Sequence, residues 1–236
     1  MGSPHPDSLN WMWIDMTAVS DDLIERYRSI PPATIGHLTG EEFLDSGIKP
    51  LFTPINCVGR ARTVRMLRGD GALSRPAIQS IRPGDVLVID QDGDEQVSCW
   101  GEMTSLAAKM RGAVGVIIDG AATDWAEIRG QQMPTFARAI TARIGSRLEL
   151  PGGSLNETIT VGGVTVNPGD LVVADDSGIC VLPAARAEEL YPASRLAEDR
   201  GPWIKRWLEA GGDLADIAGR DPASIEGMLR ERGRLS

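Results

Sequence analysis

The sequence is poor in histidine and cysteine. It has two histidines and three cysteines in 236 residues, with no CxxC pair and no Cys/His cluster: His5, His37, Cys57, Cys99 and Cys180. This scarcity excludes a His-rich metal site and argues against a zinc site. An odd number of distant cysteines is typical of a reducing compartment, so we expect a cytoplasmic protein. Any bound metal should be a hard cation held by carboxylates and water.

Long apolar runs and a surplus of positive charge are also lacking. No run approaches the roughly 18–20 residues of a membrane span, and the N-terminus lacks the basic-then-apolar layout of a secretory signal. The net charge is −9, whereas binding a phosphate backbone needs a basic face. We therefore expect neither a membrane nor a nucleic acid as a partner. Because no linker-like tract divides the chain, we expect an extension over residues 1–18 and a single domain over 19–236.

Apolar periodicity predicts alternating helices and strands in the first part of the chain. Residues 20–30 combine a Ser20 cap with acids in the first turn, which indicates a helix. A second helix, over 102–112, is amphipathic and carries on one face Met103, Leu106, Ala107 and Met110. Further segments are predicted as a short helix over 124–130 and as strands over 59–67, 83–94, 113–119 and 133–140.

The rest of the chain changes from strands to helices. Residues 157–183 are rich in β-formers and broken by Gly162-Gly163 and Asn167-Pro168-Gly169, which suggests hairpins. Beyond Pro183 we expect three helical segments, over 184–200, 202–212 and 222–233. The fold class is therefore mixed α/β around a single core, with a helical tail over 184–236.

One sequence unit occurs twice, as PGDVLVIDQDG over 83–93 and PGDLVVADDSG over 168–178. Each copy combines Pro-Gly-Asp, an apolar strand and a closing glycine. The favoured interpretation is a turn-to-strand unit used twice, in which Pro and Gly set the turn. An ancient duplication or a pair of functional loops is the alternative.

Gly101-Glu102 marks the start of the helix over 102–112. Backbone N–H groups in the first turn of a helix lack partners within the helix, and the helix dipole favours anions there. A carboxylate or a phosphate could therefore bind at this point. The alternative is that Glu102 only caps its own helix.

Two acids, Asp119 and Asp124, flank the loop between a strand and the next helix. Asp119 ends the strand over 113–119, where ligands gather in open α/β sheets. With Glu102 nearby, these acids would suit Mg²⁺, which takes one or two carboxylates and keeps several waters. For Asp124 a capping box is the competing explanation, because Glu127 follows at the required spacing.

The run GEMTSLAAKMRGAVGVIIDGAATDWAEIRGQQMPTFAR, residues 101–138, resembles the central signature of the RraA-like family. The resemblance extends from about Pro32 to Gly212 through the blocks IKPLFTPINCVGRARTV, IRPGDVLVID and VNPGDLVVADDSGICVLP. This family includes the 4-hydroxy-4-methyl-2-oxoglutarate / 4-carboxy-4-hydroxy-2-oxoadipate aldolases and the regulators of ribonuclease E activity. The resemblance implies a swivelling β/β/α fold assembled as homotrimers or dimers of trimers, with the helical tail contacting a neighbouring subunit.

The resemblance also implies roles for individual residues. In the aldolases a divalent ion, Mg²⁺ or Mn²⁺, is held by an Asp that corresponds to Asp124, and an acid at the position of Glu102 supports it through water. The keto-acid is held by backbone amides that correspond to Met103 and Thr104, next to Gly101. A Glu from a neighbouring subunit's C-terminal helix also approaches the site, and its counterpart here is Glu198 or Asp199.

The chain departs from the aldolase pattern at Thr123, where the aldolases carry an Arg that grips the substrate. Threonine cannot make that charged, bidentate contact. Arg138 is the best placed substitute, and Arg60, Arg62, Arg129 and Arg143 are further candidates; a surface or interface role is the alternative for each. Gly36-His37 stands where many relatives have Ser-Asp. His37 is thus a candidate general base, with a structural histidine as the alternative.

These residues point to a divalent-metal-dependent lyase that acts on a small 2-oxo acid and releases pyruvate. Asp124 and Glu102 would hold the ion, and the substrate would contact Gly101, the amides of Met103 and Thr104, Thr123 and Arg138, with Asp119 shaping the loop. A Lewis acid would stabilise the enolate that aldol cleavage or decarboxylation leaves. The alternative is a non-catalytic regulatory protein that acts by protein–protein contact, like the regulators of ribonuclease E activity.

Overall fold

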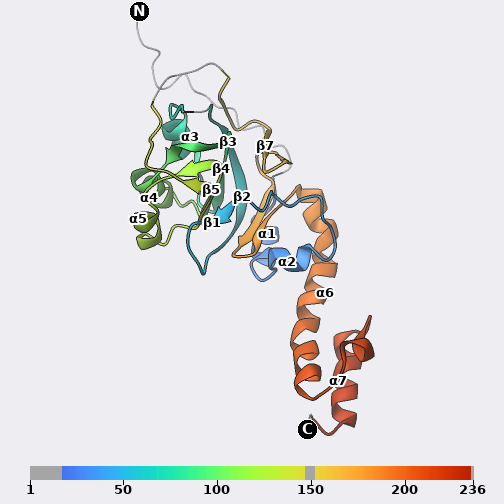
Figure 1. Ribbon diagram of the computed structural model, residues 1–236. Helices are drawn as coiled ribbons and strands as arrows, with labels where there is room; N and C mark the ends of the chain where they lie inside the picture. The colour runs from blue at the N-terminus through green and yellow to red at the C-terminus, as the bar shows by residue number, and fades with distance from the viewer. Residues whose placement is uncertain (1–17, 68, 147–151, 235–236) are drawn as a thin grey trace, which may run out of the picture.

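A computed structural model describes residues 18–67, 69–146 and 152–234 of the chain (Figure 1). Its body is an eight-stranded sheet in the order β1-β5-β4-β3-β2-β9-β10, with β6 paired to β2. The four central strands are parallel, and β1, β6, β9 and β10 are antiparallel to their neighbours. The strands are β1 (Lys49–Pro50), β2 (Asn56–Arg65), β3 (Asp85–Trp100), β4 (Gly115–Ala122), β5 (Thr135–Ile140), β6 (Ser154–Leu155), β9 (Leu171–Asp175) and β10 (Gly178–Leu182).

The mixed α/β class is confirmed, and so is the hairpin expected at Gly162-Gly163. A separate two-stranded sheet pairs β7 (Ile159–Val161) with β8 (Val164–Val166) around the Gly162-Gly163 turn. A second hairpin joins β9 to β10 and turns at residues 176–177. The expectation of a hairpin at Asn167-Pro168-Gly169 is wrong, because this turn connects β8 to β9, which pair with other strands. The extension expected over residues 1–18 lies outside the described residues except for Ala18.

Two predicted strand ends are wrong. We expected the strand over 83–94 to end in an acidic turn, but β3 runs on to Trp100. Asp92 and Gly93 adopt positive φ angles there, and the register against β4 shifts after Asp90, so the acidic stretch is an irregularity within the strand. Likewise β4 passes through Asp119 and ends at Ala122.

The repeated Pro-Gly-Asp unit builds the same turn twice. Gly84 and Gly169 both have a positive φ angle, which glycine adopts without strain. In each turn the aspartate carboxylate accepts a hydrogen bond from the backbone N–H three residues earlier, at 2.9 Å for Asp85 and 2.7 Å for Asp170. The turns lead into β3 and β9, which both pair with β2. The structure therefore agrees with a turn-to-strand unit used twice.

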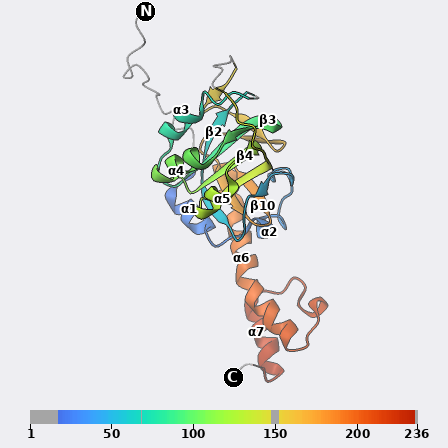
Figure 2. The ribbon, with the colours of Figure 1, turned by 60° about the vertical axis from the view of Figure 1, so that its left-hand side comes forward.

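Helices lie in two groups around the large sheet (Figures 1 and 2). At the β9–β10 end, α1 (Asp21–Tyr27) and α2 (Pro32–Ile35) pack with the first part of the C-terminal helix on Leu171, Val173 and Leu182. As predicted, Ser20 caps α1, since its hydroxyl accepts a hydrogen bond from the Leu23 N–H at 3.1 Å. The other group contacts the main core: α3 (Ser74–Ser80), α4 (Glu102–Met110) and α5 (Trp125–Gly130).

The C-terminal tail differs from the prediction in two respects. The helices expected over 184–200 and 202–212 are one helix, α6 (Ala184–Glu209), which contains Pro192 and Pro202. It extends away from the body, and α7 (Pro222–Glu231) packs against its far end after a short 3₁₀ turn, η2 (Leu214–Ile217) (Figure 1). The expectation of a single core is also wrong, because the tail buries its own apolar cluster of Trp207, Ile217, Ile225 and Leu229.

Charged side chains recur along these helices. Within the described parts of the chain, no helix combines the length and the apolar content that crossing a bilayer requires.

Candidate functional site

Two loops meet where the adjacent parallel strands β3 and β4 end. Trp100, the last residue of β3, pairs with Ala122, the last residue of β4. Gly101 then leads into α4, and Thr123 and Asp124 lead into α5. The Thr123 N–H donates a 2.9 Å hydrogen bond to the Trp100 carbonyl, which holds the two loops together. The carboxyl ends of neighbouring parallel strands thus bring Glu102 and Asp124 to one place, as expected for a ligand site in an open sheet.

The Asp124 carboxylate binds the neighbouring helix and not its own. Its Oδ2 accepts a 3.0 Å hydrogen bond from the Glu102 N–H, and its Oδ1 accepts one at 3.1 Å from the Thr123 hydroxyl. Asp124 has a left-handed backbone (φ 53°, ψ 40°) and makes no side-chain cap on α5. The capping box with Glu127 is therefore wrong. This left-handed backbone, which aspartate adopts more readily than most residues, directs the carboxylate at the start of the neighbouring helix.

The first turn of α4 offers backbone donors to a ligand. Thr104 caps this helix, because its hydroxyl accepts from the Gly101 N–H and donates to the Gly101 carbonyl, both at 2.9 Å. The backbone N–H groups of Met103 and Thr104 have no hydrogen-bond partner among the described residues. The half-exposed Glu102 carboxylate likewise makes no hydrogen bond within the described chain. The alternative that Glu102 only caps its own helix is therefore wrong. The two amides predicted to hold a substrate carboxylate are thus available.

Residue 101 has to be glycine for this arrangement to form. A Cβ atom there would lie 2.5 Å from Oδ2 of Asp124 and 2.7 Å from Cγ2 of Thr123. The backbone of Gly101 is extended, so its conformation does not require glycine. The requirement comes from the close approach of the two loops, which places the Asp124 carboxylate directly against the start of α4.

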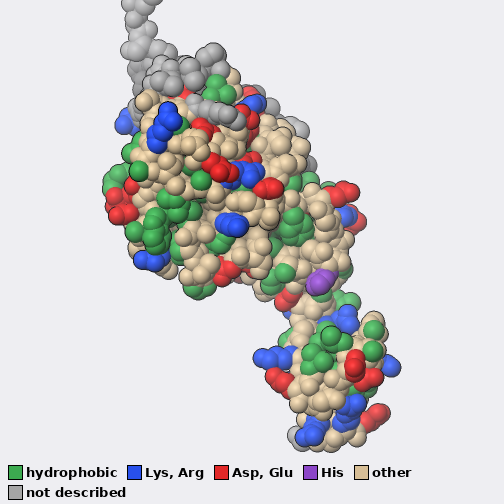
Figure 3. Space-filling model, in the orientation of Figure 1, with side chains coloured by type: hydrophobic (Ala, Val, Ile, Leu, Met, Phe, Trp, Pro, Cys, Tyr) green, Lys and Arg blue, Asp and Glu red, His purple; other side chains and the backbone are tan. Residues whose placement is uncertain are grey.

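The larger apolar side chains of α4 face solvent. An amphipathic helix on a sheet normally turns its apolar face inward. Here the residues buried against the sheet are the small Ser105 and Ala108, and the Ser105 hydroxyl accepts a 2.7 Å hydrogen bond from the buried Trp100 indole. The outward residues are Met103, Leu106 and Met110, exposed by 64%, 40% and 80%. Figure 3 shows apolar side chains gathered over the region of α4 and α5, beside the candidate site.

Asp119 and Arg138 belong to a separate network. Asp119 is a buried residue inside β4, and its carboxylate binds the Arg138 guanidinium and the Gly162 N–H. Arg138 also donates to Asp45 at 2.8 Å, and these carboxylates raise the pKa of the arginine. The expectation that Asp119 ends its strand is wrong, because β4 continues to Ala122. No contact in the described chain joins either residue to Asp124, and Arg138 is already paired.

His37 follows α2 and Glu198 lies on α6, and these two helices contact each other away from α4 and α5 (Figure 1). The Thr34 hydroxyl donates to the Glu198 carboxylate, and the backbone N–H of the exposed His37 donates to the Thr34 carbonyl at 3.3 Å. Asp199, the other candidate, pairs with Arg195 at 2.6 Å. One chain therefore does not bring His37 or Glu198 to Asp124. Their predicted roles would require a second copy.

The carboxylates fit an ion that shares its ligands with water and substrate. Among the described residues, no group of three or more His, Cys, Asp and Glu side chains could hold a metal. A complete protein cage is therefore not present in the described chain. Mg²⁺ commonly takes one or two carboxylates and completes its shell with waters and substrate oxygens. Asp124, which is exposed, and Glu102 beside it provide such a partial donor set.

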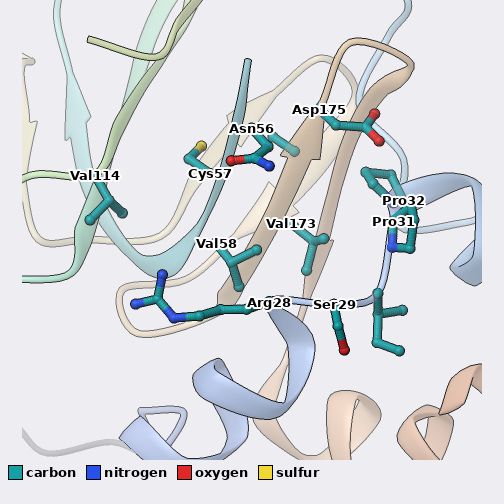
Figure 4. Close-up of a pocket in the computed structure, with 12 residues that line it drawn as sticks. Arg28, Ser29, Pro31, Pro32, Asn56, Cys57, Val58, Val114, Val173 and Asp175 are labelled. Atoms are coloured by element: carbon teal, nitrogen blue, oxygen red, sulfur yellow. The ribbon is translucent and has the colours of Figure 1, made fainter. Parts of the chain in front are cut away.

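A cavity of about 270 Å³ lies at the other end of the parallel strands (Figure 4). Asn56 at the start of β2, Val114 before β4 and Asp175 at the end of β9 line it, together with Arg28 and Pro31. None of the catalytic, substrate-binding or metal-binding residues predicted from the sequence lines this cavity. The cavity is therefore distinct from the site at Gly101 and Asp124.

Sequence reasoning missed two features of the site. Thr104 was considered only for its amide, although its hydroxyl caps α4. The segment from Thr141 to Gly145, which crosses the strand ends, was not recognised because it has no apolar periodicity. Its Thr141 N–H donates to the Ala122 carbonyl at 2.9 Å. The glycine that closes this segment was the one available signal of a turn.

Known proteins share this fold and these motifs. The sequence matches the RraA-like family, described as Aldolase/RraA, over residues 17–181. A protein of Halalkalibacterium halodurans, provisionally named a 4-hydroxy-4-methyl-2-oxoglutarate aldolase, is 35% identical over 181 residues, which are 76% of this chain and 85% of that protein. Streptomyces coelicolor RraAS2, described as an unusual member of the RNase ES inhibitor RraA protein family, has a crystal structure that is 28% identical with a TM-score of 0.69, covering 79% of this chain and 96% of its own.

The fold of an uncharacterized protein from Pseudomonas syringae pv. tomato is also similar. Its crystal structure gives a TM-score of 0.75 over 86% of this chain and 99% of its own, at 24% identity. That likeness concerns the fold alone. The family match over most of the chain confirms the prediction made from the motifs: the chain belongs to the RraA-like family.

Proposed function

We propose that the protein is a divalent-metal-dependent lyase that cleaves a small 2-oxo acid and releases pyruvate. The observation that carries the proposal is the Asp124 carboxylate held against the start of α4, next to the unpaired amides of Met103 and Thr104. The start of a helix with unpaired backbone donors favours a carboxylate ligand. The adjacent acids would hold a cation that faces the same ligand.

Each group of the chain has a part in this chemistry. The amides of Met103 and Thr104 bind the carboxylate of the 2-oxo acid and orient its keto oxygen toward Asp124. Asp124 and Glu102 would hold Mg²⁺ or Mn²⁺, which when bound supplies Lewis-acid stabilisation of the enolate charge. The Glu102 carboxylate, which has no other partner in the described chain, orders the water that accepts a proton.

The bond changes balance without a redox step. In aldol cleavage the substrate hydroxyl loses its proton to the water and its oxygen forms the C=O bond of the second carbonyl product. The adjacent C–C bond breaks as this bond forms, and its electron pair moves to the keto group as the enolate of pyruvate. In decarboxylation the same enolate forms as carbon dioxide leaves. A proton then returns to the enolate carbon to give pyruvate.

Assembly into homotrimers or dimers of trimers is part of the proposal. His37 and Glu198 lie away from Asp124 within one chain, so a neighbouring copy would have to supply them. The exposed apolar residues of α4 support an interface beside the site. Light scattering with size-exclusion chromatography tests this part, and a monomer at micromolar concentration would contradict it.

Pyruvate release tests the activity. The assay uses 4-hydroxy-4-methyl-2-oxoglutarate and oxaloacetate, with Mg²⁺ or with EDTA. We expect turnover that needs the metal and falls at least about 100-fold in Asp124→Asn, because a positioned charge at the reacting centre is lost. Glu127→Gln is the matched control, since this exposed acid lies on the same helix and makes no side-chain contact in the described chain. Equal activity of the two variants, or no turnover by the wild type, would refute the proposal.

A non-catalytic regulatory function is the second candidate. Thr123 in place of the substrate-gripping arginine and the apolar surface of α4 favour it. A protein that acts only by contact should retain its partner inhibition in Asp124→Asn and lose it in Met110→Glu. The lyase should instead lose pyruvate release in Asp124→Asn. Thr123→Arg adds a further test, because increased turnover in this variant indicates a retained catalytic site.

A further inference from the structure

The segment from Thr141 to Gly145 lies across the ends of β3 and β4. The Thr141 N–H donates to the Ala122 carbonyl at 2.9 Å, directly before Thr123. On the far side, the Arg143 carbonyl accepts from the Ser98 N–H at 2.8 Å, and the Gly145 N–H donates to the Ser98 carbonyl at 3.0 Å. The backbone on both sides of Arg143 is thus held by the two strands whose loops form the candidate site.

Most arginines that could replace the missing guanidinium have partners elsewhere. Arg60 pairs with the exposed Asp21, and Arg62 pairs with the buried Asp85. Arg138 pairs with both Asp119 and Asp45. Each of these guanidinium groups would have to break an ion pair with an aspartate before it could bind a substrate.

Two arginines near the site remain. Arg129 stacks on Trp125 with its guanidinium carbon 4.7 Å from the ring centroid, and it lies in the last turn of α5, away from Asp124 at the helix start. Arg143 is exposed, and its side chain makes no hydrogen bond, ion pair or ring contact in the described ranges. Its guanidinium is therefore the one of this set that a ligand can engage without breaking a contact among the described residues.

Arg143 lies within reach of the ligand. It is two positions from Thr141, whose N–H donates to the Ala122 carbonyl. Its partner Ser98 is two positions from Trp100, whose carbonyl accepts from the Thr123 N–H. Two extended residues span at most about 7 Å, and the arginine side chain itself is long and carries its charge at the tip. The site itself contributes the negative charges of Asp124 and Glu102, so a substrate with two carboxylates needs a cation opposite α4.

We propose that Arg143 binds the second carboxylate of the substrate, which makes the site selective for 2-oxo dicarboxylic acids. The first carboxylate binds the amides of Met103 and Thr104, as in the proposed function, on which this inference rests. The guanidinium thus reaches the ligand from the segment over the strand ends and not from position 123.

Calorimetric titration in Mg²⁺ tests the assignment with two probes of equal chain length, 2-oxoglutarate and 2-oxovalerate. The wild type should bind 2-oxoglutarate more tightly. Arg143→Ala should weaken 2-oxoglutarate binding by roughly 10- to 100-fold, the range of a charge-assisted hydrogen bond, and leave 2-oxovalerate binding unchanged. Arg143→Lys should restore part of the difference. An unchanged urea midpoint confirms that the variants fold.

Arg129→Ala is the matched control, because it removes the other nearby guanidinium, and it should bind both probes like the wild type. A loss of 2-oxoglutarate binding in Arg129→Ala and not in Arg143→Ala would overturn the assignment. Equal binding by the wild type and Arg143→Ala would also overturn it, while leaving the proposed lyase intact. A wild type that binds neither probe and releases no pyruvate would refute both.

Discussion

Replacing Gly101 with alanine tests whether the close approach of two loops controls the site. The added Cβ would lie 2.5 Å from Oδ2 of Asp124 and 2.7 Å from Cγ2 of Thr123. Non-bonded heavy atoms are best separated by about 3.5–4.0 Å, so the carboxylate would have to retreat by roughly 1 Å. That movement would break the 3.0 Å hydrogen bond from the Glu102 N–H.

The change should affect activity far more than stability. Alanine adopts the extended conformation of Gly101 and restricts the unfolded chain, which contributes about 0.4–1 kcal/mol to the free energy of unfolding. Losing the hydrogen bond to the exposed Asp124 costs about 1 kcal/mol, because water replaces the amide. These terms nearly cancel, so we expect a net change below about 1 kcal/mol. A 1 Å misplacement of a reacting group lowers kcat/KM by about 100-fold.

Three measurements check this expectation: urea unfolding, amide exchange at Glu102 by NMR, and Mg²⁺-dependent pyruvate release. Gly130→Ala is the matched control on α5, since no atom lies within 4 Å of its added Cβ. It should raise the free energy of unfolding by up to about 1 kcal/mol and leave activity unchanged. Slow exchange at Glu102 together with full activity in Gly101→Ala would refute the steric reasoning, and the exchange result does not depend on the proposed reaction.

Further predictions concern buried charges and thiols. Asp85→Asn should lower the free energy of unfolding by about 3–5 kcal/mol, because Arg62 is then a buried charge without its carboxylate. Asp21→Asn removes the carboxylate of an exposed pair and should lower the free energy of unfolding by less than about 1 kcal/mol. Similar losses for the two variants in urea unfolding would contradict the effect of burial. Burial raises the pKa of Asp90, so the folded state holds its proton more tightly and stability declines as pH rises from the ordinary aspartate pKa to the raised one. Asp90→Asn should therefore be more stable than the wild type at neutral pH and lose this advantage in acid, whereas a pH-independent difference would argue against the cause. Burial also raises the pKa of the Cys57 and Cys180 thiols to about 12. Labelling of these two buried thiols at neutral pH should therefore be slow until urea is added, and rapid labelling of the native protein would show that they are accessible.

Local sequence patterns predicted the structure correctly where contacts within a few residues decide the backbone conformation. The Ser20 cap, the two Pro-Gly-Asp turns and the Gly162-Gly163 hairpin formed where they were predicted, because each depends on hydrogen bonds or φ angles within a few residues. The ordered family motifs were also sufficient to identify the RraA-like family.

The same patterns did not predict features that depend on packing between distant parts of the chain. Periodicity identified the helix over 102–112, but it did not show that the small Ser105 and Ala108 would face the sheet and leave Met103 and Met110 in solvent. Nor did a proline end the helix at residue 202, since α6 continues through it. In both cases a local preference was overridden by contacts with distant parts of the chain.

The sequence by itself determined the residue types of the proposed site: two carboxylates, a glycine before a helix, and a threonine at position 123. Only the tertiary structure decided how these groups meet. The register of β3 on β4 sets Trp100 beside Ala122, and this alone brings Asp124 to the Glu102 amide across 22 positions of sequence. The same packing commits Arg138 to carboxylates and leaves Arg143 over the strand ends. The sequence gives the type of each residue, whereas the partner of each charged side chain depends on which strands lie side by side.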